Sequence, residues 1–114
     1  MFDSVTSAAL QSALDGLSMR QRVIADNIAN INTTDFRAGK VQFEDALAKS
    51  VVEGNGSTTP TVARSLEPTN TNGNNVNLDE ETLSNVDTVL RYQFATQAMN
   101  SELTSVRAAM RTNS

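Results

Sequence analysis

The sequence predicts an all-α fold in which two long terminal helices pair as an antiparallel, coiled-coil-like hairpin, with a short middle helix and a long polar loop between them. Apolar residues recur at helical spacing near the N-terminus and again over the last third of the chain. The segment between these stripes contains both prolines. A chain of 114 residues is long enough for one domain. We therefore expect a single domain with an N-terminal helix in 1–32, a connector with a short helix and a mobile loop in 33–76, and a C-terminal helix in 77–114.

The first helix is expected to begin at Asp3 or Ser4, since either side chain can cap a helix, and to end near Ile31. Its apolar stripe consists of Leu10, Leu14, Leu17, Ile24, Ile28 and Ile31. Gln21 is the polar position within this stripe. A polar residue there is either a solvated edge position or a device that sets helix register, and the sequence leaves both interpretations open.

A polar turn is expected after this helix. Asn30 and Asn32 tolerate the left-handed conformation that closes many helices, and Thr33, Thr34 and Asp35 can bond to nearby backbone groups. The turn therefore separates the first helix from the connector.

The connector contains a second, shorter pattern. Its apolar residues are spaced for a short helix over 41–52 that folds back on the long helices, and they are Val41, Phe43, Ala46, Leu47 and Val51. Residues 53–75 follow, with five asparagines, three glycines, Pro60 and Pro68. This composition predicts a long mobile loop.

The C-terminal helix has a clear start signal. Asn77 followed by Glu80 forms an asparagine version of the capping box, and three acidic residues lie at the positive end of the helix dipole. The helix is expected to run from about Leu78 to Arg111, roughly 50 Å at 1.5 Å per residue. One stripe contains Leu83, Val86 and Leu90, and a neighbouring one contains Val89, Tyr92, Thr96, Met99, Leu103, Val106 and Met110.

Composition argues against several classes of function. The 9 basic and 13 acidic residues give a net charge of −4 with no basic cluster, which disfavours nucleic acid as a partner. The chain has no cysteine and no histidine, so disulfides, zinc sites with nitrogen or sulfur ligands and histidine acid-base chemistry are excluded. A calcium loop around Gly73 fails because Pro68 falls at the first ligand position. We expect no catalytic, cofactor-binding or metal-binding residues, no small-molecule substrate, and no enzyme activity. The N-terminus also lacks the features of a cleaved secretory signal.

Two separated segments resemble a known family. The run Asn27–Thr33, followed by Phe36 and Arg37, resembles the N-terminal motif of bacterial flagellar rod and hook proteins. That motif usually continues Thr-Pro-Gly, whereas Thr34 and Asp35 occupy the last two of these positions here and better suit a type I turn. Downstream, 73–81 and 90–93 resemble the proximal rod subunit of the B type. The chain is thus identified as a member of the bacterial flagellar basal-body rod protein family, closest to that subunit.

The resemblance implies a structural subunit of the flagellar proximal rod. Such a subunit assembles with itself and with others through its terminal helices, forming the drive shaft between membrane ring and hook for cell motility. The implied partners are other rod subunits, the rod-base adaptor, the membrane ring and the export gate. The implied location is the basal body outside the cytoplasmic membrane, reached by flagellar type III export without a cleaved signal peptide.

Asn27 and Asn30 lie three residues apart on one helix face, and we assign capping to Asn30 and a subunit contact to Asn27. The full set of expected interface residues is Leu10, Leu14, Leu17, Ile24, Asn27, Ile28, Ile31, Leu90, Tyr92, Met99, Leu103, Val106 and Met110. The expected motif turn consists of Asn30, Asn32, Thr33, Phe36 and Arg37.

The sequence leaves an alternative function open. Two helices alone cannot cover broad apolar stripes on both, so other molecules should supply the missing neighbours. Exposed helical stripes also serve proteins that bind a single partner. The alternative is a helical adaptor, or another flagellar axial protein, that binds one partner at fixed stoichiometry.

Overall fold

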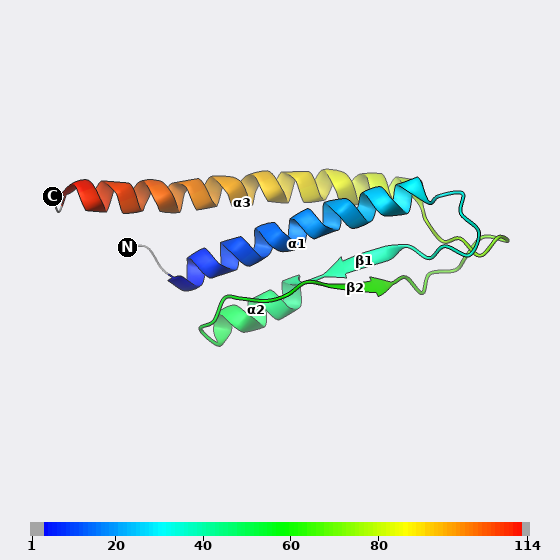
Figure 1. Cartoon of the computed structure of the whole chain (residues 1–114), viewed down its shortest axis with the longest axis horizontal. Helices are drawn as coiled ribbons and strands as arrows, with labels where there is room; N and C mark the ends of the chain where they lie inside the picture. The colour runs from blue at the N-terminus through cyan, green and yellow to red at the C-terminus, as the bar shows by residue number, and fades with distance from the viewer. Residues whose placement is uncertain (1–3, 113–114) are drawn as a thin grey trace.

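The computed structural model describes residues 4–112 and arranges them in three adjacent layers (Figure 1). Helix α1 (Ser4–Ala29) lies between helix α3 (Leu78–Thr112) on one side and a small layer on the other. That small layer contains strand β1 (Gly39–Gln42), helix α2 (Glu44–Val52) and strand β2 (Thr61–Arg64). The Cα atoms span 67 × 26 × 14 Å, so the subunit is elongated and close to one helix thick.

The two terminal helices run side by side in opposite directions (Figure 1). Helix α1 ends at Ala29, two residues before the expected end, and Asn30 caps it through Nδ2, which donates to the Asp26 carbonyl at 2.8 Å. The start of α3 is also confirmed, since Asn77 Oδ1 accepts a hydrogen bond from the Glu80 backbone N–H at 3.2 Å. Asp3, the alternative start of the first helix, lies outside the described residues.

The prediction of an all-α fold is wrong in the connector, which contains a two-stranded antiparallel sheet. The register pairs Gly39 with Arg64 and Val41 with Val62. The expected helix over 41–52 begins only at Glu44, because Val41 lies in β1 and faces the core. Strand β2 falls within the segment predicted to be a long mobile loop, so that prediction is wrong at Thr61–Arg64.

The hydrophobic core is small and lies where α1 meets the connector. Its fully buried members are Leu17, Val41 and Phe43, which are 4, 6 and 4% exposed. The ring of Phe43 packs directly on Gly16, where a Cβ added to the glycine would lie only 2.5 Å from Phe43 Cδ1. Gly16 therefore allows the connector to approach α1 closely, which explains a glycine inside a long helix.

Arg20 joins the elements around this core. Its guanidinium lies 5.0 Å from the centroid of the Phe43 ring and donates to the Val41 carbonyl at 2.8 Å. It also donates two hydrogen bonds to the Glu44 carboxylate, at 2.6 and 2.7 Å. Glu44 in turn lies 3.7 Å from Arg91 of α3. One arginine of α1 thus links β1, α2 and, through Glu44, α3.

Replacing Gly16 with Ala should destabilise the subunit, although alanine is the better helix former. The added methyl group would overlap the buried Phe43 ring, and overpacking of this kind costs about 1–3 kcal/mol, more than the roughly 1 kcal/mol gained in helix propensity. Urea unfolding followed by circular dichroism measures the difference. The matched control is Gln11→Ala at an exposed position of the same helix, which should be neutral or slightly stabilising. A Gly16→Ala variant as stable as this control would contradict the packing argument.

The Arg20–Glu44 pair should make stability depend on pH in the acid range. Hydrogen bonds from Arg20 lower the pKa of Glu44 below 4.5, outweighing the opposite effect of partial burial. The contribution of the ionised carboxylate is therefore complete above pH 4.5 and is lost as the pH falls through the lowered value. We expect Glu44→Gln to be less stable than the native chain at pH 7, with a difference that shrinks on acidification. A difference that stays constant from pH 7 to pH 3 would argue against this pair as its cause.

Candidate functional site

A group of buried and half-buried polar side chains, here called the polar junction, joins the end of α1 to β1 and the start of α3. Asn27, 1% exposed, lies at its centre. Its Oδ1 accepts from the Gly39 backbone N–H at 2.9 Å, and its Nδ2 donates to the Gly39 carbonyl at 2.9 Å and to Glu81 Oε1 at 3.1 Å. Lys40 Nζ lies 3.1 Å from the same Glu81 oxygen, and Glu81 is also only 1% exposed. The polar junction comprises Asn27, Lys40, Asn74, Asn75 and Glu81.

Asn74 and Asn75 complete the junction from the segment that precedes α3. Asn74 is fully buried, and its Nδ2 donates to the carbonyls of Asn30 and Thr33 at 2.8 and 2.7 Å. Its Oδ1 accepts from the Val76 backbone N–H at 2.8 Å. Asn75 Oδ1 accepts from the Ala38 backbone N–H at 2.7 Å. The two segments that carry the family resemblance therefore bind each other within one subunit.

The turn after α1 adopts a geometry that the sequence did not indicate. Asp35 has a φ of +62°, and the Phe36 backbone N–H donates to the Thr33 carbonyl at 3.3 Å. A positive φ at the third residue of a β-turn excludes the expected type I turn and matches type II. Asp35 thus adopts a backbone conformation that glycine, the usual residue at this position of the motif, takes without strain. Its backbone N–H donates to the Asn72 carbonyl at 2.8 Å, so contact with the segment before α3 holds this conformation.

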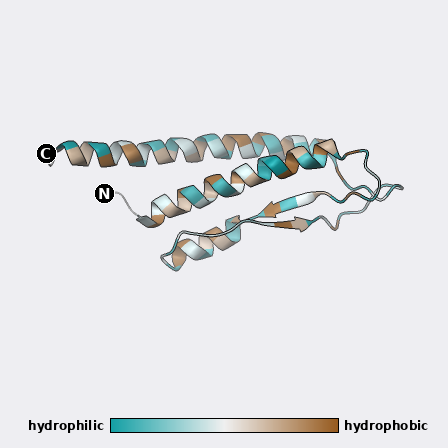
Figure 2. Ribbon diagram, in the orientation of Figure 1, coloured by the Kyte–Doolittle hydropathy of each residue, from teal (hydrophilic) through white to brown (hydrophobic). Residues whose placement is uncertain are grey.

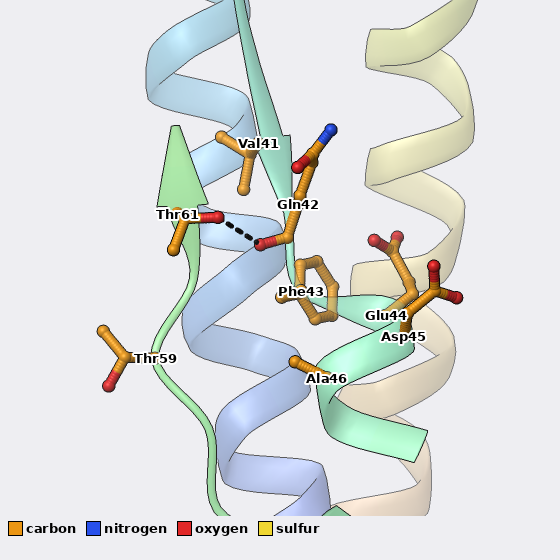
Figure 3. A pocket seen from close by; sticks show the side chains of 8 residues that line it. All are labelled: Val41, Gln42, Phe43, Glu44, Asp45, Ala46, Thr59 and Thr61. Carbon is orange, nitrogen blue, oxygen red and sulfur yellow. Dashed lines mark hydrogen bonds between the residues drawn. The ribbon is translucent and has the colours of Figure 1, made fainter. Parts of the chain in front are cut away.

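A groove of about 480 Å³ lies between the start of α2 and β2 (Figure 3). Its hydroxyl groups come from Thr59 and Thr61, and its carboxylates come from Glu44 and Asp45. Figure 3 shows the carboxylates on the opposite side of the groove from the threonines, and Glu44 is already bound to Arg20. These groups do not converge on one point, as general acid-base catalysis would require. The groove is thus a surface feature and not a catalytic arrangement.

The expected interface residues fall into three classes of exposure. Leu17, Ile24 and Asn27 are buried inside the subunit. Those that are half-buried are Leu10, Leu14, Ile28, Ile31, Met99 and Val106. Those that are exposed are Leu90, Tyr92, Leu103 and Met110. Of the motif turn, Asn30 and Phe36 are half-buried, whereas Asn32, Thr33 and Arg37 are exposed.

Helix α3 carries an apolar surface on the side away from α1, here called the outer stripe. It consists of Leu83, Val86, Leu90 and Phe94, which are 71, 53, 60 and 75% exposed. Phe94 was not among the expected interface residues, although it follows Leu90 at the i+4 spacing that extends the stripe by one turn. Figure 2 shows that apolar residues recur along α3 with polar residues between them. In residues 4–112, no helix is apolar over a length sufficient to span a bilayer.

The contact between Asp35 and Gly73 allows the geometry of the turn to be tested by mutation. Gly73 has a φ of +81°, and a Cβ there would collide with Asp35 Oδ1 and lie 3.1 Å from Asp35 Cα. Gly73→Ala should therefore destabilise the subunit more than Gly54→Ala, where φ is +83° and no atom lies within 4 Å. Asp35→Gly should raise stability by up to about 1 kcal/mol, because glycine adopts positive φ without strain. Thermal unfolding of the three variants measures these differences, and equal losses for Gly73→Ala and Gly54→Ala would contradict the proposed clash.

Comparison with known proteins finds relatives that align over most of the chain. Residues 9–37 match the family model described as flagella basal body rod protein. The flagellar basal body rod protein FlgB of Bacillus subtilis is 30% identical, and the alignment covers 94% of each chain. The FlgB protein of Borreliella burgdorferi is 28% identical over 86% of this chain and 90% of its own length. The FlgB protein of Escherichia coli is also 28% identical, over 82% of this chain and 83% of its own.

These alignments cover 82 to 94% of the chain, so the likeness is not limited to the N-terminal motif. The relatives are structural proteins of the flagellar rod and not enzymes. The chain therefore belongs to the flagellar basal body rod protein family, FlgB type, whose members are structural subunits of the proximal rod.

Proposed function

We propose that this chain is a non-enzymatic building block that assembles with itself and with other rod subunits through its terminal helices into the drive shaft between membrane ring and hook. The observation that carries this proposal is the exposed apolar surface of α3 in a chain whose relatives are rod proteins. A helix inside a monomer would bury such side chains, and exposed contiguous apolar surface marks a site of association. A structural role in motility follows from this assembly.

The exposed residues Leu90, Tyr92, Leu103 and Met110 supply the subunit contacts in this proposal, together with the half-buried members of the expected set. Asn27, Leu17 and Ile24 instead stabilise the subunit itself. Within each subunit the paired terminal helices form a coiled-coil-like hairpin, and neighbouring hairpins pack against one another.

The C-terminal part of α3 is favourably placed for such contacts. Asn27 and Glu81 lie side by side, so at equal rise per residue the start of α1 at Ser4 is level with about residue 104 of α3. Figure 1 shows α3 continuing past the first described residue of α1. Leu103 and Met110, near this projecting end, are 45 and 67% exposed.

The partners proposed by family membership are the other rod subunits, the rod-base adaptor, the membrane ring and the export gate. The proposed route is flagellar type III export, without a cleaved signal peptide, to the basal body outside the cytoplasmic membrane. Export of this kind precedes assembly, so the two steps can be separated experimentally.

Leu103→Asp should block assembly without blocking export. The residue is half exposed in the subunit, so the fold tolerates the charge, but burial of an unpaired carboxylate between subunits is strongly unfavourable. We expect the variant to be made and secreted while cells lack hooks and filaments and do not swim. Secretion is measured by immunoblot of the culture medium, and assembly is measured by electron microscopy of basal bodies.

The matched control is Thr104→Asp, which places the same charge at an adjacent, exposed position on a different side of the helix. Cells that carry Thr104→Asp should swim normally. Normal basal bodies in the Leu103→Asp strain would show that this part of α3 is not a rod interface. A purified chain that saturates at one fixed stoichiometry with a single partner would favour the adaptor alternative.

A further inference from the structure

We propose that Asn72 is a site of spontaneous modification, at which the folded chain loses ammonia and converts asparagine to aspartate or isoaspartate. This inference does not depend on the proposed function. Asparagine followed by glycine is especially prone to this reaction, because glycine has no Cβ to hinder attack by its own backbone nitrogen. The chain contains two such pairs, Asn55–Gly56 and Asn72–Gly73. Their surroundings in the structure differ, and the difference selects the second pair.

The reaction needs only water. The backbone nitrogen of Gly73 loses its proton and attacks Cγ of Asn72, while the side-chain nitrogen takes up a proton and leaves as ammonia. The product is a cyclic imide, and water then opens its ring at one of the two carbonyl groups. Opening at the side-chain carbonyl gives aspartate. Opening at the main-chain carbonyl gives isoaspartate, in which the main chain runs through Cβ and Cγ.

The side chain of Asn72 is exposed and already directed toward the next peptide. It lies in the loop 70–74, which closes where the Asn70 backbone N–H donates to the Asn74 carbonyl at 2.8 Å, at the end of the subunit opposite the C-terminus (Figure 1). Asn72 Oδ1 accepts a hydrogen bond from the Asn74 backbone N–H at 3.1 Å, so the side chain bends forward over the main chain. This holds Cγ near the nitrogen that attacks it. The same N–H stabilises the negative charge that develops on Oδ1 during the attack.

The peptide between Asn55 and Gly56 is fixed on both sides instead. The backbone N–H groups of Asn55 and Gly56 both donate to the Ser50 carbonyl, at 2.9 and 3.2 Å. The Gly56 carbonyl accepts from Ser12 Oγ at 3.3 Å. Gly56 is buried against α1, where an added Cβ would lie 2.6 Å from the Val5 carbonyl oxygen. Closure of the imide ring would have to disrupt this packing.

Other features of the two pairs are shared and do not separate them. Each glycine N–H donates a hydrogen bond, from Gly73 to the Asn70 carbonyl at 2.9 Å and from Gly56 to the Ser50 carbonyl, and this bond opposes the attack at both sites. Both glycines also have positive φ, +81° at Gly73 and +75° at Gly56. The pairs differ in the packing of the peptide and in the direction of the asparagine side chain. Both differences favour reaction at Asn72.

Modification of Asn72 weakens the contact between its loop and the turn after α1. The Asn72 carbonyl accepts a hydrogen bond from the Asp35 backbone N–H at 2.8 Å, and the Asp35 side chain lies against Gly73. Isoaspartate lengthens the main chain at this point, and both products place a new negative charge beside Asp35. Like charges close together repel. The subunit should therefore become less stable with time in solution.

Peptide mass spectrometry of the purified full-length chain tests the site. The chain is kept in mildly alkaline buffer, with and without urea, and the deamidated fraction of each pair is followed over time. In the folded chain we expect Asn72 to react roughly tenfold faster than Asn55, the effect of about one hydrogen bond. In urea the two sites should react at similar rates. Faster reaction at Asn55 in the folded chain, or equal rates at the two sites, would overturn the proposal.

Replacement by glutamine tests the consequence, because glutamine keeps the amide but would have to close a larger ring and so reacts far more slowly. Each variant is compared by thermal unfolding before and after the same incubation. The midpoint should fall for the native chain and for the matched control Asn55→Gln, and should stay unchanged for Asn72→Gln. Asn72→Asp should show part of this loss before incubation, since it adds the charge without lengthening the main chain. An equal fall for Asn72→Gln and the native chain would contradict the role assigned to Asn72.

Discussion

The arrangement of this subunit depends on the hydrogen bonds by which Asn27 fixes Gly39 and Glu81 at the end of α1. Its amide uses both N–H groups and its oxygen, so one side chain positions β1 and α3 at once. A buried carboxylate such as Glu81 is tolerated only where it has partners, and Asn27 and Lys40 provide them. Loss of Asn27 would remove one of the two partners of the buried Glu81 carboxylate and the acceptor of the Gly39 backbone N–H.

The fold depends on the hydrogen bonds of the polar junction because the apolar core is small. The buried apolar residues are few and gather mainly where α1 meets the connector, while the buried side chains of Asn27 in α1 and Glu81 in α3 are polar and bond to each other. Directed hydrogen bonds define one register between two helices more sharply than apolar contacts do, since a shift by one turn would break them. The subunit thus has a well-defined shape and still leaves large apolar side chains uncovered.

The sequence predicted those parts of the structure that depend on residues close together in the chain. It was less informative about parts that depend on contacts between distant segments. Helical periodicity and the caps at Asn30 and Asn77 act within a few residues, and both long helices were predicted nearly to their ends. Strand β2 was missed because all four of its residues are exposed and its pairing partner lies some twenty residues away. The positive φ of Asp35 arises from contact with Asn72 and Gly73, which the local preference of Thr-Asp for a type I turn could not reveal.

The unequal lengths of the two long helices have a geometric consequence for any assembly of this chain. Helix α3 has 35 residues and the described part of α1 has 26, which corresponds to about 14 Å of additional helix. A layer of such subunits has an uneven rim, with the ends of α3 standing above the ends of α1. Subunits of the next layer must pack between these projecting helix ends. The difference in length between the two helices therefore constrains both the contacts within a layer and the contacts between layers.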